Sequence, residues 1–539
     1  MNRRDFSKLW TFALPGLALG KVVAGAHARD SEAELVPIAP GPFKPTFESL
    51  KQYETPEWFI DAKLGIFLHW GPCAVGGTHG WYGREMYRQG SETYRFHVSH
   101  FGHPSRFGYK DICSLFTAEK FDAVQADALV KLYKQAGARY VVPVAVHHDN
   151  FDMWDSRYQP RWNAKVASGK DIIGMWKKAT EANDLRFGVS SHVARTYRWF
   201  QTSHQADKEG PLKGVPYDGA DPQYSDLYGV PWKVADPTFA AWSIDCDYEQ
   251  YRDVGPPEWE RQFERRMRDL LDRYEPDFYY TDGGIPFHVH PSGLNILAHF
   301  YNSSIARHGK LEAVAAIKLD WQPNDAVLDF EGATKGGIPD YYWQSDKAVN
   351  REWYWMRWEK PEEYISVKRV IATLMDNISR NGCLLLNLPL KPDGTFDPAV
   401  VQMLEEMGQC TRNIGEAIFA TRPWEVFGEG PTDFSENFLA GTARDIRFAR
   451  NKANTVLYAT ALDWPGDGAT LTITTLKAGR FDAGAISSVT LLQNPGKLVW
   501  KQDEAGLKVT LPASAPGVDI YTLKIIFKTR AIPKLQEIR

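Results

Sequence analysis

Short apolar runs alternate with amphipathic stretches between about residues 50 and 425. The runs are rich in Val, Ala, Ile and Tyr and end in polar side chains, as expected of buried parallel strands. Between several of them, apolar residues recur every three or four positions, which is the spacing of a helix with one buried face. The predicted strands cover residues 64–69, 140–147, 186–192, 278–282, 313–318, 326–331, 341–345 and 383–388.

Three predicted helices have clear limits. They cover residues 122–136, residues 258–274 and residues 361–381, the last of which starts at Pro361 and ends at Asn381-Gly382. Strands that alternate with helices form parallel sheets. About eight such strands in one region predict an α/β fold, a (β/α)8-like (TIM) barrel, and a doubly wound open sheet is the alternative.

The pattern changes after Trp424. Residues 470–476 and 507–511 alternate with period two, residues 521–527 are rich in β-forming side chains, and helical periodicity is absent. We therefore predict a catalytic barrel over residues 29–425 and a C-terminal antiparallel β-sandwich over residues 426–539. Residues 196–255 are long, aromatic and without periodicity, which predicts a functional insertion that covers the carboxyl face of the barrel.

The first 28 residues have the pattern of an export signal. Residues 2–8 read NRRDFSK, an apolar stretch follows over residues 9–23, and Ala26-His27-Ala28 is a small-residue cleavage site. The apolar stretch is short and contains Pro15-Gly16, so we predict no membrane span. A twin-arginine-type signal predicts a periplasmic or secreted protein.

Composition and charge narrow the function classes. A net charge of −4 without a basic stripe argues against nucleic-acid binding. The 19 Trp, 24 Tyr and 28 Phe residues fit carbohydrate contact or a large aromatic core. The 5 Cys residues are widely spaced without a C-x-x-C motif, so they predict neither a disulfide framework nor a zinc site, and we predict no cofactor.

Polar side chains gather where the predicted strands end. Residues 139–156 read RYVVPVAVHHDNFDMWDS, so a strand ends in His147 and His148, and other strands end in His69, His192 and Asp282. Burying such groups costs free energy unless their hydrogen bonds are used. The carboxyl ends of barrel strands carry active sites, and mixed polar and aromatic side chains suit a sugar.

Metal binding is the competing use of these histidines. His147 and His148 are adjacent on a strand and therefore point to opposite faces. His288 and His290 share one face, but no further ligand is fixed near them in sequence. We predict no catalytic metal.

Two carboxylates are needed to cleave a glycosidic bond. Asp282 is the candidate nucleophile because Gly283-Gly284 lets the backbone bend away from it, although an Asp before Gly is also common in turns. Glu331, at the end of another predicted strand, is the candidate acid/base. Its rivals are Glu312, Glu352 and Asp340.

Several ordered motifs over about residues 50–425 resemble glycoside hydrolase family 29, the α-L-fucosidases. The motifs are 61–71 (DAKLGIFLHWG), 81–87 (WYGREMY), 147–156 (HHDNFDMWDS), 187–192 (FGVSSH), 381–387 (NGCLLLN) and 415–419 (GEAIF). The resemblance implies a barrel with a C-terminal β-sandwich and a retaining mechanism. Asp282 matches the nucleophile of the family, and Glu331 matches the acid/base through its Asp-x-Glu-Gly context.

The resemblance also implies roles in substrate binding. His69, His147 and His148 match fucose-binding histidines, and Tyr280 takes the place of an aromatic residue that is usually Trp. We assign Trp81 and His192, within the same motifs, to substrate binding as well. Many members carry Glu before the Trp-Tyr pair where this chain has Gly80, which leaves one hydroxyl contact open.

The predicted function is exo-acting hydrolysis of terminal α-L-fucosides by double displacement. Glu331 would stay protonated because low local polarity and the charge of Asp282 raise its pKa. The expected partner is a fucosylated oligosaccharide or polysaccharide. The alternatives are a carbohydrate-binding homologue that lost catalysis, or a hydrolase of a related L-sugar such as an α-L-galactoside.

Overall fold

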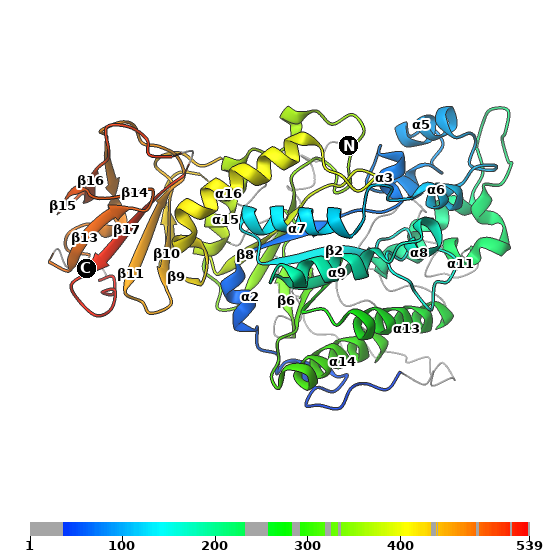
Figure 1. Cartoon of the computed structure of the whole chain (residues 1–539), viewed down its shortest axis with the longest axis horizontal. Coiled ribbons are helices and arrows are strands. Elements are labelled where there is room, and N and C mark those ends of the chain that lie inside the picture. Colours follow the sequence, from blue (N-terminus) through cyan, green and yellow to red (C-terminus); the bar gives the residue numbers. More distant parts are fainter. Residues whose placement is uncertain are drawn as a thin grey trace, which may run out of the picture.

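The chain forms a barrel and a smaller body of antiparallel sheets side by side, in the computed structural model of Figure 1. The structure describes residues 36–231, 257–282, 291–318, 325–332, 336–432, 438, 440–480, 484–517 and 520–536. The predicted signal over residues 1–28, residues 232–255 of the predicted insertion, Gly283-Gly284, and His288 and His290 lie outside the described residues. Within the described part, no helix is long and apolar enough to cross a membrane.

Eight parallel strands close into a barrel in chain order, because β8 pairs with β1. This confirms the predicted barrel and excludes an open sheet. Close packing explains Gly65 in β1, since a Cβ there would lie 2.2 Å from the ring of Tyr140. The strands are β1 (Leu64–Leu68), β2 (Tyr140–Val146), β3 (Arg186–Ser191), β4 (Phe278–Thr281), β5 (Val314–Ile317), β6 (Val327–Asp329), β7 (Trp343–Ala348) and β8 (Gly382–Asn387).

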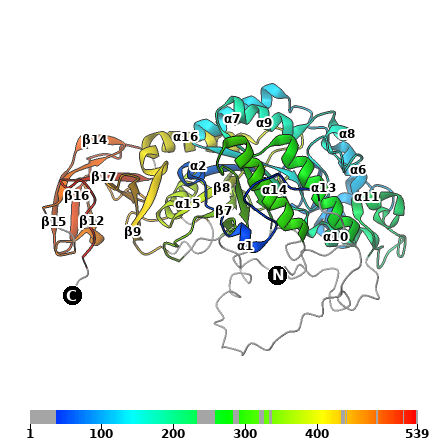
Figure 2. The same cartoon turned by 90° about the horizontal axis from the view of Figure 1, so that it is seen from below.

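Helices surround the barrel (Figures 1 and 2). The Asp122 side chain caps α7 by accepting from the Gln125 amide, and Gly137 ends it with a φ of 104°. The longer helices are α7 (Ala123–Ala136), α9 (Ile172–Ala182), α13 (Pro257–Tyr274), α14 (Pro291–His308), α15 (Val367–Ser379) and α16 (Pro398–Ile418). Shorter ones are α1 (Phe47–Leu50), α2 (Glu57–Ala62), α3 (Cys73–Gly76), α4 (Tyr82–Glu85), α5 (Glu92–His100), α6 (Tyr109–Leu115) and α8 (Ala164–Ser168).

The helix predicted from Pro361 starts later than expected. Pro361–Glu363 form a separate 3-10 turn, which the Glu363 carboxylate closes by accepting from the Lys360 amide at 2.9 Å. Tyr364 is extended, with φ −70° and ψ 147°, and its hydroxyl donates to Asp397. Tyr364 is therefore buried by contacts outside the helix, and its distance in sequence from Val367 matches helical spacing only by coincidence.

The described part of the predicted insertion lies at the carboxyl end of the barrel. It contains α10 (Thr196–Trp199), η4 (Phe200–His204) and α11 (Ser225–Tyr228). The ring of Trp199 lies 6.3 Å from the ring of His148, directly after β2. The hydroxyls of Tyr87 and Tyr228 both donate to Asp218, which ties this segment to the loop between β1 and β2.

Two antiparallel sheets form the C-terminal body, as predicted. One has the order β14-β13-β17-β11-β10-β9 and the other β12-β16-β15, around a hydrophobic core of their own. Helices α15 and α16 lie between this body and the barrel (Figures 1 and 2). The strands are β9 (Thr421–Glu429), β10 (Ile446–Asn451), β11 (Val456–Ala461), β12 (Thr470–Ile473), β13 (Ile486–Leu491), β14 (Asn494–Lys497), β15 (Val499–Asp503), β16 (Gly506–Thr510) and β17 (Tyr521–Phe527).

Candidate active site

Asp282 lies directly after β4, where its backbone amide donates to the carbonyl of Ser191 at 3.1 Å. Asp282 is buried, with 7% of the residue exposed. Oδ2 lies 3.2 Å from Nε2 of His148 and 3.6 Å from Nδ1 of His192. The ends of β2, β3 and β4 thus meet at one carboxylate, as the sequence predicted.

Lys318 follows β5 and joins three carboxylates. Its Nζ lies 2.8 Å from Oδ1 of Asp282, 2.7 Å from Oε2 of Glu331 and 3.5 Å from Oδ2 of Asp346. Burial would lower the pKa of Lys318, but these carboxylates raise it well above its usual value. The ammonium group is therefore charged and fixes the two candidate catalytic carboxylates relative to each other.

The charge of Asp282 is stabilised in the same way. Burial would raise its pKa, but the positive charges of Lys318 and Arg195 and hydrogen bonds from the two histidines outweigh burial. The pKa of Asp282 therefore lies well below its usual value. An ionised carboxylate is what a nucleophile needs.

Glu331 lies two residues beyond β6, and its side chain is half exposed. The following Gly332 has a φ of 66°, and its amide donates to the carbonyl of Asp346 at 3.1 Å, which turns the chain at this point. Burial and Asp282 raise the pKa of Glu331 as expected, but the charge and hydrogen bond of Lys318, together with the charge of Arg195, bring it below its usual value. The prediction that Glu331 holds a proton in the free protein was therefore wrong, because the sequence analysis overlooked Lys318.

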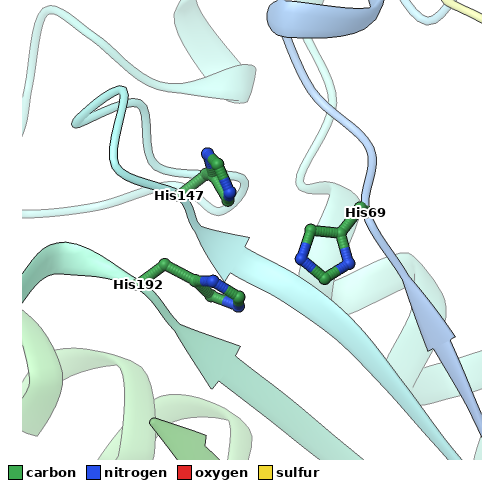
Figure 3. A group of neighbouring side chains, drawn as sticks. All are labelled: His69, His147 and His192. Atoms are coloured by element: carbon green, nitrogen blue, oxygen red, sulfur yellow. The ribbon is translucent and has the colours of Figure 1, made fainter. Parts of the chain in front are cut away.

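Three histidines face one another from the ends of β1, β2 and β3 (Figure 3). One ring nitrogen of each of His69, His147 and His192 lies within 4.8 Å of the others, and all three are buried. Nδ1 of His147 has no hydrogen-bond partner among the described residues. Such a group could hold a transition metal ion, and its free ring nitrogens equally suit sugar hydroxyls.

Asn387, the last residue of β8, orients His69. Its Oδ1 lies 2.8 Å from Nδ1 of His69 and accepts from the His69 amide at 3.0 Å. Its Nδ2 donates to the carbonyl of Trp353 at 2.7 Å, and the Trp353 ring lies 5.0 Å from His69. Burial lowers the pKa of His69 well below its usual value, so the imidazole is neutral.

The two aromatic candidates lie on either side of these histidines. The Trp81 ring packs edge-on against His148 at 5.6 Å. Tyr280 is fully buried 5.7 Å from His192, and its hydroxyl donates to Asp346 at 2.8 Å. All eight predicted site residues are thus gathered at the carboxyl end of the barrel.

Below Lys318, a polar network crosses the inside of the barrel. Gln344 accepts from the hydroxyl of Tyr140 at 2.9 Å and donates to Asp329 at 2.6 Å. Burial, and then the neighbouring Asp346, raise the pKa of Asp329 well above its usual value. Asp329 therefore favours its protonated form, and the opposite effects of the two carboxyl groups on each other's pKa place it as the donor toward Asp346.

The three alternative candidates for the acid/base differ in where they lie in the barrel. Glu312 precedes β5 and pairs with Arg186 at the start of β3, at 2.9 Å, so it lies at the opposite end of the barrel. Asp340 precedes β7 and lies at that end as well. Glu352 follows β7, and its Oε2 accepts from the Gly80 amide at 3.4 Å.

Sequence reasoning missed Lys318, Asn387 and Trp353. Lys318 ends an apolar strand, the same signal that identified Asp282, but a terminal Lys also suits a solvent-facing strand end. Asn387 lies in a quoted motif without a predicted role. Trp353 lies in a loop, where no periodicity indicates which side chains face the site.

The comparisons with known proteins agree with this geometry. The family profile described as Alpha-L-fucosidase matches residues 32–416. The chain belongs to the α-L-fucosidase family. The profile of the Alpha-L-fucosidase C-terminal domain matches residues 441–526.

Relatives and solved structures cover nearly the whole enzyme. Tissue alpha-L-fucosidase of Rattus norvegicus is 26% identical over 504 residues, which is 90% of this chain and 93% of the relative. Tissue alpha-L-fucosidase of Homo sapiens is 24% identical over 90% of this chain and 92% of the relative. The Thermotoga maritima alpha-fucosidase in complex with a mechanism-based inhibitor has a TM-score of 0.69 at 26% identity, covering 90% of this chain and all of that one. The enzyme is a glycoside hydrolase of α-L-fucosides.

Proposed function

We propose that the enzyme cleaves terminal α-L-fucosides by double displacement, with Asp282 as nucleophile and Glu331 as acid/base. The observation that carries this assignment is the position of Lys318 between them. Because its Nζ lies 2.8 Å and 2.7 Å from the two carboxylates, their facing oxygens can be at most about 5.5 Å apart. Retaining glycosidases have carboxyl groups about 5–5.5 Å apart, and inverting ones about 6.5–9.5 Å.

The reaction would begin with the ionised Asp282. Its Oδ attacks the anomeric carbon, the bond to the leaving oxygen breaks, and Glu331 donates a proton to that oxygen. Glu331 then removes a proton from water, which attacks the same carbon and releases Asp282. Stereochemistry is thereby retained.

Lys318 has opposite effects on the two carboxylates. It keeps Asp282 ionised, which favours attack, but it also favours the ionised form of Glu331. Protonation of Glu331 therefore requires that its contact with Lys318 weaken when a glycoside occupies the site. The half-exposed side chain of Glu331 leaves it free to move toward a leaving group.

The substrate is a terminal fucoside, and the buried histidines support this assignment. His69, His147 and His192 bring ring nitrogens within 4.8 Å of one another, and His192 lies 3.6 Å from Asp282, so hydroxyls of a sugar bound beside Asp282 would find partners there. Trp81 and Trp353 flank the histidines and offer apolar rings to C–H groups. Neither a binding protein without catalysis nor an L-galactosidase has an observation in its favour.

The test is kinetic and stereochemical. Proton NMR of early hydrolysis of 4-nitrophenyl α-L-fucoside should show α-L-fucose first. Asp282→Ala should be inactive, and Glu331→Ala should be slow and rescued by azide as a glycosyl azide. Early formation of β-L-fucose, or a Glu331→Ala variant with wild-type rates, would contradict the assignment.

We also infer that the protein is exported to the periplasm or beyond. The support is the sequence of residues 1–28, with Arg3-Arg4 before the apolar stretch. In a bacterium with a twin-arginine pathway, activity should be found in the periplasmic or secreted fraction. Arg3→Lys with Arg4→Lys should retain it in the cytoplasm, and equal export of both forms would exclude this route.

A further inference from the structure

Two loops carry a tryptophan each to the rim of the histidine pocket. Trp81, after β1, packs edge-on against His148 at 5.6 Å. Trp353, after β7, lies 5.0 Å from His69 and 5.8 Å from Nζ of Lys318. The residues directly before the two tryptophans, Gly80 and Glu352, contact each other.

Besides the hydrogen bonds of Arg357 to the backbone of the first loop, one contact between the loops is made by a carboxylate. Oε2 of Glu352 accepts from the amide of Gly80 at 3.4 Å and lies 3.9 Å from Nδ1 of His79. The Glu352 side chain is 25% exposed, and no Lys or Arg of the described ranges forms an ion pair with it. A carboxylate offers about four acceptor positions, so these two long contacts leave most of its capacity unused.

Gly80 makes room for this carboxylate. A Cβ at position 80 would lie 3.3 Å from Oε2 of Glu352, closer than ordinary contact. A side chain at position 80 and the carboxylate of Glu352 therefore compete for one space. The glycine is explained by the position of the glutamate.

A sugar hydroxyl donates one hydrogen bond and accepts others, so its pocket needs acceptors as well as donors. Asp282 and Glu331 are reserved for the anomeric carbon and the leaving oxygen. Glu352 is a third carboxylate, and it directly precedes Trp353, whose ring lies 5.0 Å from His69. Its position fits an acceptor for a hydroxyl proton.

We propose that Glu352 is a specificity-determining residue that accepts a hydrogen bond from a ring hydroxyl of the bound fucose, with position 80 kept as glycine to admit it. This inference rests on the proposed function. A hydroxyl bound to a charged acceptor is recognised strongly, because a substrate without that hydroxyl leaves the carboxylate unpaired.

The experiment exchanges the two positions. Glu352→Ala should lower kcat/KM on 4-nitrophenyl α-L-fucoside about tenfold to a hundredfold, and Glu352→Gln by less. Gly80→Glu alone should also lower it, because two carboxylates would crowd one space. The double variant Gly80→Glu with Glu352→Ala should regain at least about tenfold over Glu352→Ala, since the new carboxylate reaches the same place. Glu362→Ala, an exposed glutamate of the 3-10 turn η8 (Pro361–Glu363), is the matched control and should behave as wild type.

A second measurement separates recognition from loop support. Wild type should lose about tenfold or more on one of the 2-, 3- and 4-deoxy fucosides, and Glu352→Ala should no longer discriminate against that one. Equal losses on all three, or no rescue in the double variant, would show a loop-supporting role and overturn the inference. If the wild type is active and Glu352→Ala has the same kcat/KM, the role of Glu352 is overturned and the proposed function stands. If the wild type is inactive on every α-L-fucoside, the proposed function itself is overturned.

Discussion

Lys318 shows how one side chain sets the charge of two others. Its ammonium lies within 3 Å of both Asp282 and Glu331, and it lowers the pKa of each. A positive charge in that position keeps the nucleophile Asp282 ionised, but it also makes the acid Glu331 less able to hold its proton. The pH range of the enzyme is therefore a compromise set mainly at this residue, with a smaller contribution from Arg195.

Replacing Lys318 with Met should move the activity range to higher pH. Without the positive charge, the pKa of Asp282 rises and shifts the acid limb of kcat/KM upward, and the pKa of Glu331 rises and shifts the alkaline limb upward. Activity at the new optimum should fall about tenfold to a hundredfold, because a charge-assisted hydrogen bond to the nucleophile is lost. The pH profile on 4-nitrophenyl α-L-fucoside measures this.

Lys310→Met is the control for that experiment, since Lys310 pairs with Glu312 at the far end of the barrel, at 2.6 Å. Its profile should match wild type. A Lys318→Met profile with unmoved limbs would show that Lys318 does not control either carboxylate.

Asp329 should make folding stability depend on pH. Its pKa in the folded state is raised, so the folded enzyme keeps a proton that the unfolded chain loses near pH 4. Its contribution to stability is therefore present at low pH and is lost as pH rises. Asn at this position can still accept from Gln344 and donate to Asp346.

The melting temperature of Asp329→Asn relative to wild type should accordingly increase between pH 5 and pH 8. Differential scanning calorimetry across that range provides the measurement. A difference that stays constant with pH would mean that Asp329 carries no extra proton.

At the scale of elements, β8 organises the pocket although no catalytic residue lies on it. Asn387 at its end binds both His69, directly after β1, and the loop after β7. Asn387→Ala should lower kcat/KM about tenfold or more, because it leaves buried groups without partners and releases the His69 ring. We expect the loss to appear as a rise in KM for the fucoside, because the displaced His69 would bind the sugar less well.

A matched control is Asn302→Ala. Asn302 of α14 is also buried and donates to the carbonyls of Ala39 and Phe43 at 2.9 and 2.8 Å, away from the pocket. It should lose a similar amount of thermal stability while KM stays unchanged. If both variants changed KM equally, the effect of Asn387 would be one of general stability.

Much of this fold follows from the sequence because its elements are regular. Strands end in residues such as His69, His147 and Asp282, whose burial without a use would cost free energy. The predicted start of α15 was wrong because Tyr364, which binds Asp397, lies three residues before Val367, a spacing that also suits a helix. From the sequence, Glu352 was only an alternative candidate for the acid/base. Its contact with Gly80 joins two loops far apart in the chain, and such a contact leaves no pattern in the sequence of either loop.

At the scale of the whole molecule, the sandwich is joined to the barrel by buried charge. Nε of Arg447 in β10 lies 2.5 Å from Oδ1 of Asp376 in α15, and Arg380 binds the other oxygen of Asp376 at 3.0 Å. Asp376 is fully buried and Arg447 is 2% exposed. The C-terminal body therefore braces the helix that leads into β8.

Arg447→Ala should destabilise the enzyme by about 3–5 kcal/mol, because it leaves the buried carboxylate partly unpaired. Urea unfolding measures the free energy of unfolding of this variant and of a control, Arg444→Ala. Arg444 is exposed, so its replacement should change that free energy by less than about 0.5 kcal/mol. A loss in Arg447→Ala as small as in the control would show that the sandwich is not needed to hold α15.

The closure of β1 onto β8 has a consequence for synthesis of the chain. Gly65 pairs with Leu385, so the first barrel strand has no partner on one side until most of the protein has left the ribosome. An unpaired strand edge invites pairing with other chains. During translation the nascent enzyme is therefore exposed to aggregation for longer than a protein built from local contacts, and its yield in a cell should depend on chaperones that shield the first strand.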